Sequence, residues 1–405
     1  MKKYLLLVLL SLSFIFTINA SEISLKHAID SAIAHNHAVN NQRLLIDYRE
    51  ILRKSGYTIE QAVLSFDYGQ INSVYTDTKL SLSQRYQFPT VYSKQQSLLT
   101  EEWNASIVSK DVSIAQVKKT VSDVFYTILI LKRKERILLE ADSIYSEYVR
   151  ISRVRLEKGE SNILENSFHE IEKGSIHMQL QELRNALHVY EVQFHLLLNT
   201  IDSYMPASAE LEDINNTSLI INDITNHPLL RQGRQSIEIA KAQYALEQSR
   251  FLPDLLIGIS NHSIQGVGAD DVLYPASRRF NSLSIGIGIP HPFGAQTAKI
   301  EASETAVKIT EAEYQFQLKS VYAELQSAIV RRDSVLSMIH SWKQYQIPII
   351  ERVRNAANAQ YISGEITYLE WTMSMQQTMT IQIQYLQLLQ TYHELTNTII
   401  YLQQQ

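Results

Sequence analysis

The sequence contains no cysteine and few chain-breaking residues, with only 12 glycines and 8 prolines among 405 residues. The absence of cysteine excludes disulfides, thiol chemistry, cysteine-ligated iron–sulfur clusters and the lipid anchor of a conventional bacterial lipoprotein. The scarcity of glycine and proline predicts a few very long elements instead of many short ones.

Motifs typical of enzymes are also missing. The sequence has no H-E-x-x-H, no G-x-S-x-G and no glycine-rich phosphate loop, so we expect no enzymatic activity, no resident metal and no cofactor. A formal net charge of −5 gives no indication of nucleic acid binding. Beyond residue 20 no run is apolar enough for a transmembrane helix, and the uncharged stretch Thr372–Tyr392 is rich in glutamine. Any crossing of a membrane must therefore use β-strands.

The N-terminus has the pattern of a secretory signal peptide. Two lysines follow Met1, an apolar run extends from Tyr4 to Ile18, and small residues come next. A transmembrane anchor would need about 20 apolar residues, and this run is shorter. We predict a signal peptide over residues 1–20 that is cleaved after Ala20.

Two similar stretches, half a chain apart, organise the rest of the sequence. Arg155–Glu165 reads RLEKGESNILE, and Ala359–Glu370 reads AQYISGEITYLE. Gly159 and Gly364 supply the left-handed backbone that ends a helix, and the polar residues Ser161, Asn162 and Thr367 can cap the helix that follows. Each stretch predicts a tight tip between two antiparallel helices, and two such tips indicate a duplicated protein.

The first repeat is predicted to span residues 21–200. A helix is expected from Ser24 through His35-Asn36-His37 to about Gln61, followed by a hairpin over 64–89 in which apolar and polar residues alternate. A heptad rhythm without glycine or proline then predicts a helix of about 100 Å, at 1.5 Å per residue, that ends at the tip 155–165. A second helix, Ile163–Leu198, completes the repeat, and the polar residues 201–223 form a connector.

The second repeat is predicted to span residues 224–405. A helix starts at Asn226-His227-Pro228 and is followed by a hairpin over 254–290. Another long helix, which Pro348 should kink, leads to the tip 359–370 and a final helix. The fold class is therefore mainly α with a membrane β-barrel portion, built from a duplicated helix–β-hairpin–long helix–helix repeat. Four strands per chain cannot close a barrel in lipid, so we expect a trimer with a 12-stranded β-barrel on a periplasmic α-helical barrel.

These features resemble the TolC-type outer membrane efflux protein family over essentially the whole mature chain. The resemblance rests on the duplication, on the Asn226–Pro228 helix start, on the strand-ending prolines Pro89 and Pro290, and on the two glycine-glutamate tips. The stretch Tyr68–Tyr92 is similar to the CzcC/CusC-like branch, which serves heavy-metal RND pumps.

The resemblance implies an exit duct in the cell outer membrane that extends into the periplasm. Its implied partners are two further copies of the chain, a periplasmic membrane-fusion adaptor, an inner-membrane RND pump and outer membrane lipid, with no nucleic acid. It also implies that the tips form the periplasmic gate. Tyr361 and Glu370 match a closing-network tyrosine and a constriction acid of the family, whereas Ile366 and Met373 depart from its pattern. The tip positions that we single out are Gly159, Glu165, Tyr361, Gly364 and Glu370.

Histidine and methionine are the remaining candidates for a binding site. His169, His177, His188 and His195 recur along one helix, but their separations are too wide for one chelate, so surface histidines are the alternative to weak metal contacts. His35 and His37 are interpreted as structural. Met373, Met375 and Met379 suggest either packing or affinity for a soft metal.

The sequence thus supports a passive, trimeric exit duct of a tripartite RND efflux system, with heavy-metal cations as the expected cargo. An alternative in the same class is a general drug efflux or type I secretion channel. An alternative of a different class is a soluble periplasmic coiled-coil scaffold whose hairpins pack in a soluble sheet.

Overall fold

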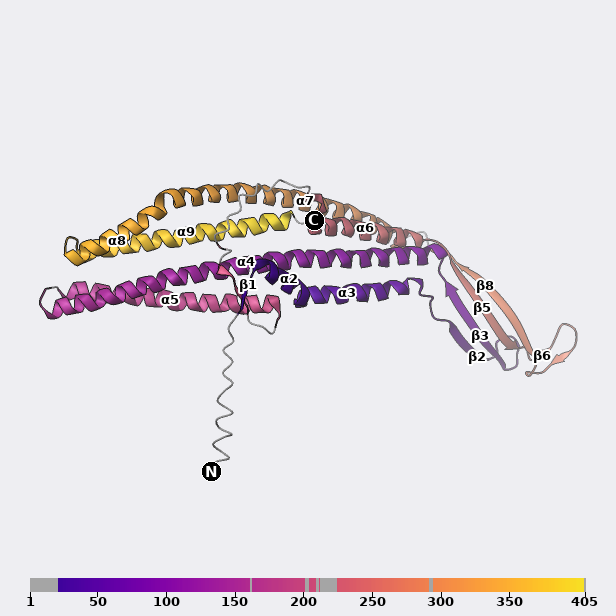
Figure 1. Ribbon diagram of the computed structural model, residues 1–405. Coiled ribbons are helices and arrows are strands. Elements are labelled where there is room, and N and C mark those ends of the chain that lie inside the picture. The colour runs from indigo at the N-terminus through magenta and orange to yellow at the C-terminus, as the bar shows by residue number, and fades with distance from the viewer. Residues whose placement is uncertain are drawn as a thin grey trace, which may run out of the picture. The chain divides into compact units, whose positions relative to one another are not determined.

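The computed structural model describes residues 21–160, 162–200, 204–208, 211, 224–290 and 294–403. The predicted signal peptide, Ser161 and most of the predicted connector lie outside these residues. Figure 1 shows the elements in chain order.

The first half of the chain follows the predicted order of helix, hairpin, long helix and helix. Helix α4 continues for 69 residues because no glycine or proline follows Pro89, its first residue. The elements of this half are α2 (Leu25–His35), α3 (His37–Arg53), η1 (Lys54–Tyr57), β2 (Val63–Gly69), β3 (Asp77–Tyr86), α4 (Pro89–Glu157) and α5 (Ile163–Leu198).

The second half repeats this order, so the predicted duplication of mainly helical elements around β-hairpins is confirmed. We keep 21–200 and 224–405 as the proposed limits of the repeats. The elements of this half are η3 (Ile224–Asn226), α6 (Pro228–Ser249), β5 (Asp254–Ser263), β6 (Gly266–Val267), β7 (Leu273–Tyr274), β8 (Arg279–Gly288), α7 (Ala295–Ser341), the π-helical η4 (Trp342–Gln346), α8 (Ile347–Ser363) and α9 (Tyr368–Leu402).

By their contacts, residues divide into two compact units that cut across the repeats. One unit comprises Met1–Asn40, Ser113–His227 and Val321–Gln405, and the other comprises Asn41–Val112 and Pro228–Ser320. The second unit holds the sheet and has a small core of Val91, Leu98 and Leu246. Among the described residues, no helix is both long enough and apolar enough to cross a membrane.

The two hairpins join into one antiparallel sheet with the order β2-β3-β5-β8. Strands β3 and β5 pair between the hairpins, with Leu82 opposite Ile259. Side chains alternate between the two faces of a strand, so this register places most of the apolar residues of the four strands on one face. Most of the serines and glycines lie on the other face, together with Val63, Leu256 and Phe280.

The helix predicted from Ser24 to about Gln61 is wrong in two respects. Helical structure ends at Tyr57, and the chain leaves helical geometry at Asn36 (φ −61°, ψ 131°). The Asn36 side chain accepts a hydrogen bond from the Ala38 backbone N–H at 2.8 Å and donates one to the Leu197 carbonyl at 3.1 Å. Asn36 therefore caps α3 and at the same time satisfies a carbonyl of the last turn of α5.

The start of the second repeat makes a similar contact with its own last helix. The buried His227 lies with Nε2 2.9 Å from the Tyr401 carbonyl, in the last turn of α9. In each repeat a polar side chain thus connects the first helices to the end of the last helix.

Pro348 interrupts the second long helix through the π-helical segment η4. Pro348 has no N–H group to donate to the carbonyl four residues earlier. Directly before it, the Ile347 N–H donates to the Trp342 carbonyl, five residues earlier, which is the π-helical hydrogen bond. The predicted kink is therefore a break between α7 and α8.

A parallel strand pair that joins the predicted connector to the start of the first repeat was not anticipated. Strand β1 (Ser21–Ile23) pairs with β4 (Tyr204–Pro206), with Glu22 opposite Met205. Because the strands have only three residues each and lie about half a chain apart, no local pattern indicates their pairing.

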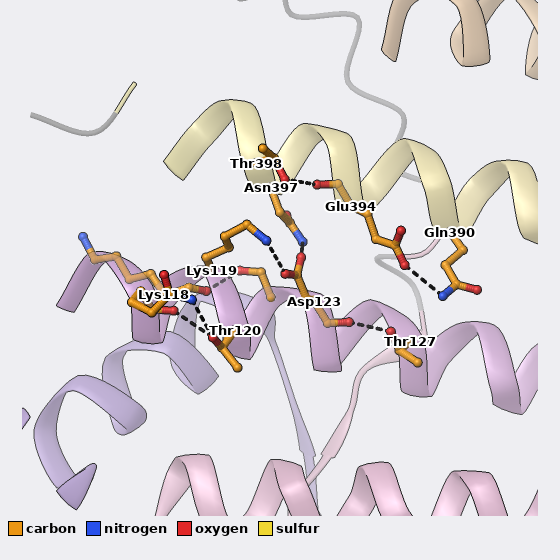
Figure 2. A network of polar contacts seen from close by, with 11 residues as sticks. Lys118, Lys119, Thr120, Asp123, Thr127, Gln390, Glu394, Asn397 and Thr398 are labelled. Carbon is orange, nitrogen blue, oxygen red and sulfur yellow. Dashed lines mark hydrogen bonds and ion pairs between the residues drawn. The ribbon is translucent and has the colours of Figure 1, made fainter. Parts of the chain in front are cut away.

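A polar network connects α4 with α9 (Figure 2). The Asp123 carboxylate accepts hydrogen bonds from Lys119 Nζ at 2.8 Å and from Asn397 Nδ2 at 2.9 Å. Lys119 and Asp123 border a groove of about 840 Å³ that is lined mainly by α4, α7 and α9. Next to it, Phe125, Ile128, Phe194 and Leu389 belong to the main hydrophobic core of this unit.

Candidate functional site at the helix tips

Both tips end their first helix with the same backbone motif. Gly159 and Gly364 adopt φ of 74° and 79°, as predicted for left-handed residues. The Glu160 N–H donates to the Arg155 carbonyl at 2.8 Å, and the Glu365 N–H donates to the Gln360 carbonyl at 2.9 Å. These bonds satisfy equivalent carbonyls at the ends of α4 and α8 and fix both turns in the same geometry.

The helices that follow the tips also begin in the same way. Asn162 accepts a hydrogen bond from the Glu165 N–H at 2.9 Å, and Thr367 accepts one from the Glu370 N–H at 3.3 Å. The predicted capping by Asn162 and Thr367 is therefore confirmed. Glu165 and Glu370 consequently occupy the same third helical position in the two repeats.

The two equivalent glutamates have different environments. Glu370 is exposed and turns back onto the Thr367 N–H and Oγ1, at 2.8 Å and 2.9 Å, which completes a capping box. These hydrogen bonds, first the one from the Thr367 backbone, lower the pKa of Glu370. Glu370 is thus an anion held at the N-terminus of α9.

Glu165 is buried and points between the two tips. It accepts a hydrogen bond from the Tyr361 hydroxyl at 2.5 Å and contacts the Arg155 guanidinium at 3.3 Å. Burial raises the pKa of Tyr361, and its hydrogen bond to Glu165 raises it further. The phenol therefore stays protonated and donates to the carboxylate.

An aromatic cluster surrounds this contact. Trp371 Nε1 donates to Asn358 Oδ1 at 2.8 Å, and the Tyr148 hydroxyl donates to the same oxygen at 3.3 Å. The rings of Tyr148 and Trp371 lie 4.0 Å apart, and those of Tyr361 and Trp371 lie 5.5 Å apart. These contacts give the site its apolar enclosure.

We call this group the tip cluster. Its members come from four helices, α4, α5, α8 and α9, and they join the first tip to the second tip of the same chain. The tip cluster comprises Tyr148, Arg155, Glu165, His169, Asn358, Tyr361 and Trp371.

The sequence predicted Glu165 and Tyr361 as tip residues, and the structure brings them together. It does not place Glu370 in the tip cluster, although Trp371 follows it directly. Tyr148, Asn358 and Trp371 were not predicted. The three-residue spacing of Tyr145 and Tyr148 on α4 is the one local signal that both face the core at this end of the helix.

The four histidines of α5 do not share one environment. His177 and His188 are exposed, whereas His169 is completely buried, so the interpretation as surface residues is wrong for His169. His35 and His37, interpreted as structural, are exposed. Within the described ranges, no group of three or more histidine and acidic side chains is arranged to hold a metal ion.

The three methionines of α9 divide in the same manner. Met375 is buried in the hydrophobic core at the tips, and Met379 packs against that core. Met373 is 62% exposed. Packing therefore accounts for two of the three methionines.

Comparisons with known proteins agree with this architecture. The family of outer membrane efflux proteins matches residues 219–401. The cobalt-zinc-cadmium resistance protein CzcC of Cupriavidus metallidurans is 21% identical over 286 residues, which cover 69% of this chain and 66% of that relative, just under two thirds of its length.

Solved structures share the fold over nearly the whole chain. Crystal structures of CusC match with a TM-score of 0.74 at 15% identity, covering 96% of this chain and 95% of CusC. The CmeC outer membrane channel of Campylobacter jejuni matches with a TM-score of 0.77 at 15% identity, covering 96% of this chain and 90% of CmeC.

The family match and the similarity to CzcC agree with the resemblance found in the sequence. The matched proteins are efflux proteins and channels, which agrees with the predictions of a non-enzymatic protein and of a location in the outer membrane. The match over residues 219–401 and the shared fold make the outer membrane efflux proteins the family to which this chain is similar.

Proposed function

We propose that three copies of the chain form the outer membrane exit duct of a tripartite efflux system. The two contrasting faces of the β-sheet carry this proposal. One face exposes a large set of apolar side chains, broken by Gln84, which a sheet in water would bury. They include Leu64, Phe66, Leu80, Leu82, Leu255, Ile257, Ile259, Leu283, Ile285 and Ile287.

The opposite face is small and hydroxyl-rich. Ser65 and Ser81 lie 2.8 Å apart through their hydroxyls, and Ser260 and Ser282 lie 2.7 Å apart. Gly258, on the same face, contacts Ser284. Such a surface suits a water-filled lumen, whereas the apolar face suits lipid.

The two edges of the sheet favour assembly of several chains. In the part of the chain that the structure describes, β2 pairs only with β3, and β8 pairs only with β5. An unpaired edge is costly in lipid, because its N–H and C=O groups find no partner there. Three chains that pair β2 of one copy with β8 of the next close a barrel without edges.

The helices then extend from this barrel into the periplasm, and the six tips of the trimer surround its periplasmic mouth. The tip cluster holds the two tips of each chain together and serves as the closed gate. A periplasmic adaptor and an inner-membrane RND pump are the proposed partners, since a passive duct has no energy source of its own.

Heavy-metal cations are the proposed cargo. The similarity to the cobalt-zinc-cadmium resistance protein CzcC supports this assignment, as does the anionic Glu370 at the second tip. A general drug or type I secretion channel is the alternative. The exposed apolar sheet face favours either duct over a soluble scaffold.

Deletion of the gene, with the neighbouring pump intact, tests the cargo. We expect the inhibitory concentration of one or more heavy-metal cations to fall several-fold, and expression of the wild-type gene to restore it. Growth inhibition by a panel of metals and organic drugs is the measurement. Increased sensitivity to drugs alone would assign the duct to drug efflux.

Replacement of Glu370 by glutamine tests its place in the duct. Glutamine also completes a capping box, so the variant removes the charge and keeps the helix start. If three copies of Glu370 surround the constriction, the preference for cations over anions decreases. Reversal potentials in planar bilayers under a salt gradient measure this preference. Glu365→Gln, at the same tip, is the matched control, and equal selectivity of both variants argues against a constriction at Glu370.

A further inference from the structure

His169 is a buried member of the tip cluster, unlike a histidine on the protein surface. It lies one helical turn after Glu165 on α5 and has no exposed surface. Its ring lies between 5.5 Å and 6.2 Å from those of Tyr148, Tyr361, Tyr368 and Trp371. Rings from α4, α8 and α9 thus enclose the imidazole.

The hydrogen bonds around His169 place a proton on its Nε2 atom. Its Nε2 lies 3.2 Å from the Tyr361 hydroxyl, which in turn lies 2.5 Å from Glu165 Oε1. A carboxylate only accepts hydrogen bonds, so the Tyr361 hydroxyl donates to Glu165 and accepts from the His169 Nε2–H. The neutral imidazole protonated on Nε2 fits this chain of bonds.

The other ring nitrogen has no such contact. His169 Nδ1 is buried and has no hydrogen-bond partner among the described residues. Protonation would place an N–H group and a positive charge there without an acceptor, which is unfavourable in apolar surroundings. The packed tip is therefore built for neutral histidine.

We propose that His169 is a positioning residue of the gate, which directs the Tyr361 hydroxyl to Glu165 when neutral and releases the tip when protonated. This inference rests on the proposed function of the tips as the gate. It adds a proton-dependent response to that gate.

The groups around His169 offer little negative charge to compensate the positive charge that protonation of its ring would add. Glu165, on the same helix, is its nearest carboxylate, but Arg155 from α4 already pairs with it. From α8 and α9 the facing titratable groups are the phenols of Tyr361 and Tyr368, and from α4 the phenol of Tyr148. The exposed pair of Arg153 and Glu170 neutralises itself at the surface.

The direction of the response follows from burial. Burial lowers the pKa of His169, and the nearby Glu165 opposes this shift only in part. The packed tip therefore binds fewer protons than an opened tip with a solvated histidine. Its stability is fully present above the ordinary histidine pKa of about 6.5 and is lost as the pH falls through the lowered pKa.

Conductance of the purified full-length protein in planar bilayers, recorded from neutral to acidic pH, tests the proposal. We expect the ratio of open to closed channels to rise as the pH falls, by at most about tenfold per pH unit for each of the three His169 copies that is protonated on opening. His169→Gln retains an N–H donor for Tyr361 but does not titrate, so we expect a closed channel without this rise. His177→Gln changes an exposed histidine of the same helix and should keep the wild-type response.

A pH response in His169→Gln equal to that of the wild type overturns the proposal, as does a wild-type channel without a pH response. If His169→Gln does not assemble, His169→Leu takes its place, because leucine fills the apolar enclosure and has no group that titrates. A pH response in His169→Leu equal to that of the wild type also overturns the proposal. A protein that forms no conducting channel at any pH contradicts the proposed function itself, which is a distinguishable failure.

Discussion

Replacing Ile285 by lysine is expected to prevent assembly in the outer membrane, whereas lysine at the adjacent Ser284 should leave assembly intact. Ile285 lies opposite Ile257 on the apolar face of the sheet and is 69% exposed. A lysine in the middle of a lipid-facing strand costs about 2–4 kcal/mol. A trimer carries this cost three times, which is comparable to the whole stability of many proteins.

Ser284 is a matched control because it is the preceding residue of the same strand. It faces the hydroxyl-rich side, where its Oγ donates to the Gly258 carbonyl at 3.2 Å. A lysine at this position extends into the proposed lumen and remains hydrated. Ile285→Val, which conserves the apolar character, controls for the substitution itself.

The amount of trimer in the outer membrane fraction, measured by native electrophoresis, distinguishes the two faces. Loss of the trimer in Ile285→Lys but not in Ser284→Lys supports a lipid-facing sheet. Equal assembly of both lysine variants contradicts it. If both fail, Ser282→Lys on the same hydroxyl-rich face decides whether any lysine in β8 is tolerated.

Much of the fold could be predicted because its long elements are encoded locally. The absence of glycine and proline after Pro89 predicts α4 nearly to the residue. The alternation around Leu80 and Leu82 likewise predicts β3 as a half-apolar strand. The left-handed glycines and the caps of both tips were predictable because they depend on residues within one turn of each other.

The features that could not be predicted depend on distant partners. Asn36 breaks a helix by reaching Leu197, 161 residues away. No sequence pattern on α5 indicates that His169 is buried, because its burial depends on rings from three other helices. Glu165 and Glu370 occupy equivalent positions, and only the three-dimensional packing against Tyr361 separates a buried hydrogen-bond acceptor from an exposed helix cap.

The asymmetry between these glutamates leads to the second large effect. Tyr361→Phe removes the hydroxyl that donates to Glu165 and leaves this buried carboxylate with Arg155 and its remaining contacts. Removing a hydrogen bond to a buried charged group costs about 1.5–3 kcal/mol. If the tip cluster closes the duct, this cost falls on the closed state. We therefore expect the ratio of open to closed channels to increase by about tenfold or more, since 1.4 kcal/mol corresponds to a factor of ten.

A double-mutant cycle with Glu165→Gln separates this contact from general loosening. Glutamine still accepts the Tyr361 hydrogen bond but loses the charge that pairs with Arg155, so alone it should open the channel less. The combined variant should open less than the product of the single effects, because two residues in contact do not act independently.

Tyr345→Phe, at a tyrosine that is 60% exposed, is the control and should behave as the wild type. Single-channel recordings at neutral pH, where His169 is neutral, measure the wild type, the three variants of the cycle and the Tyr345→Phe control. A closed Tyr361→Phe channel, or strictly independent effects in the cycle, would show that the gate is held elsewhere.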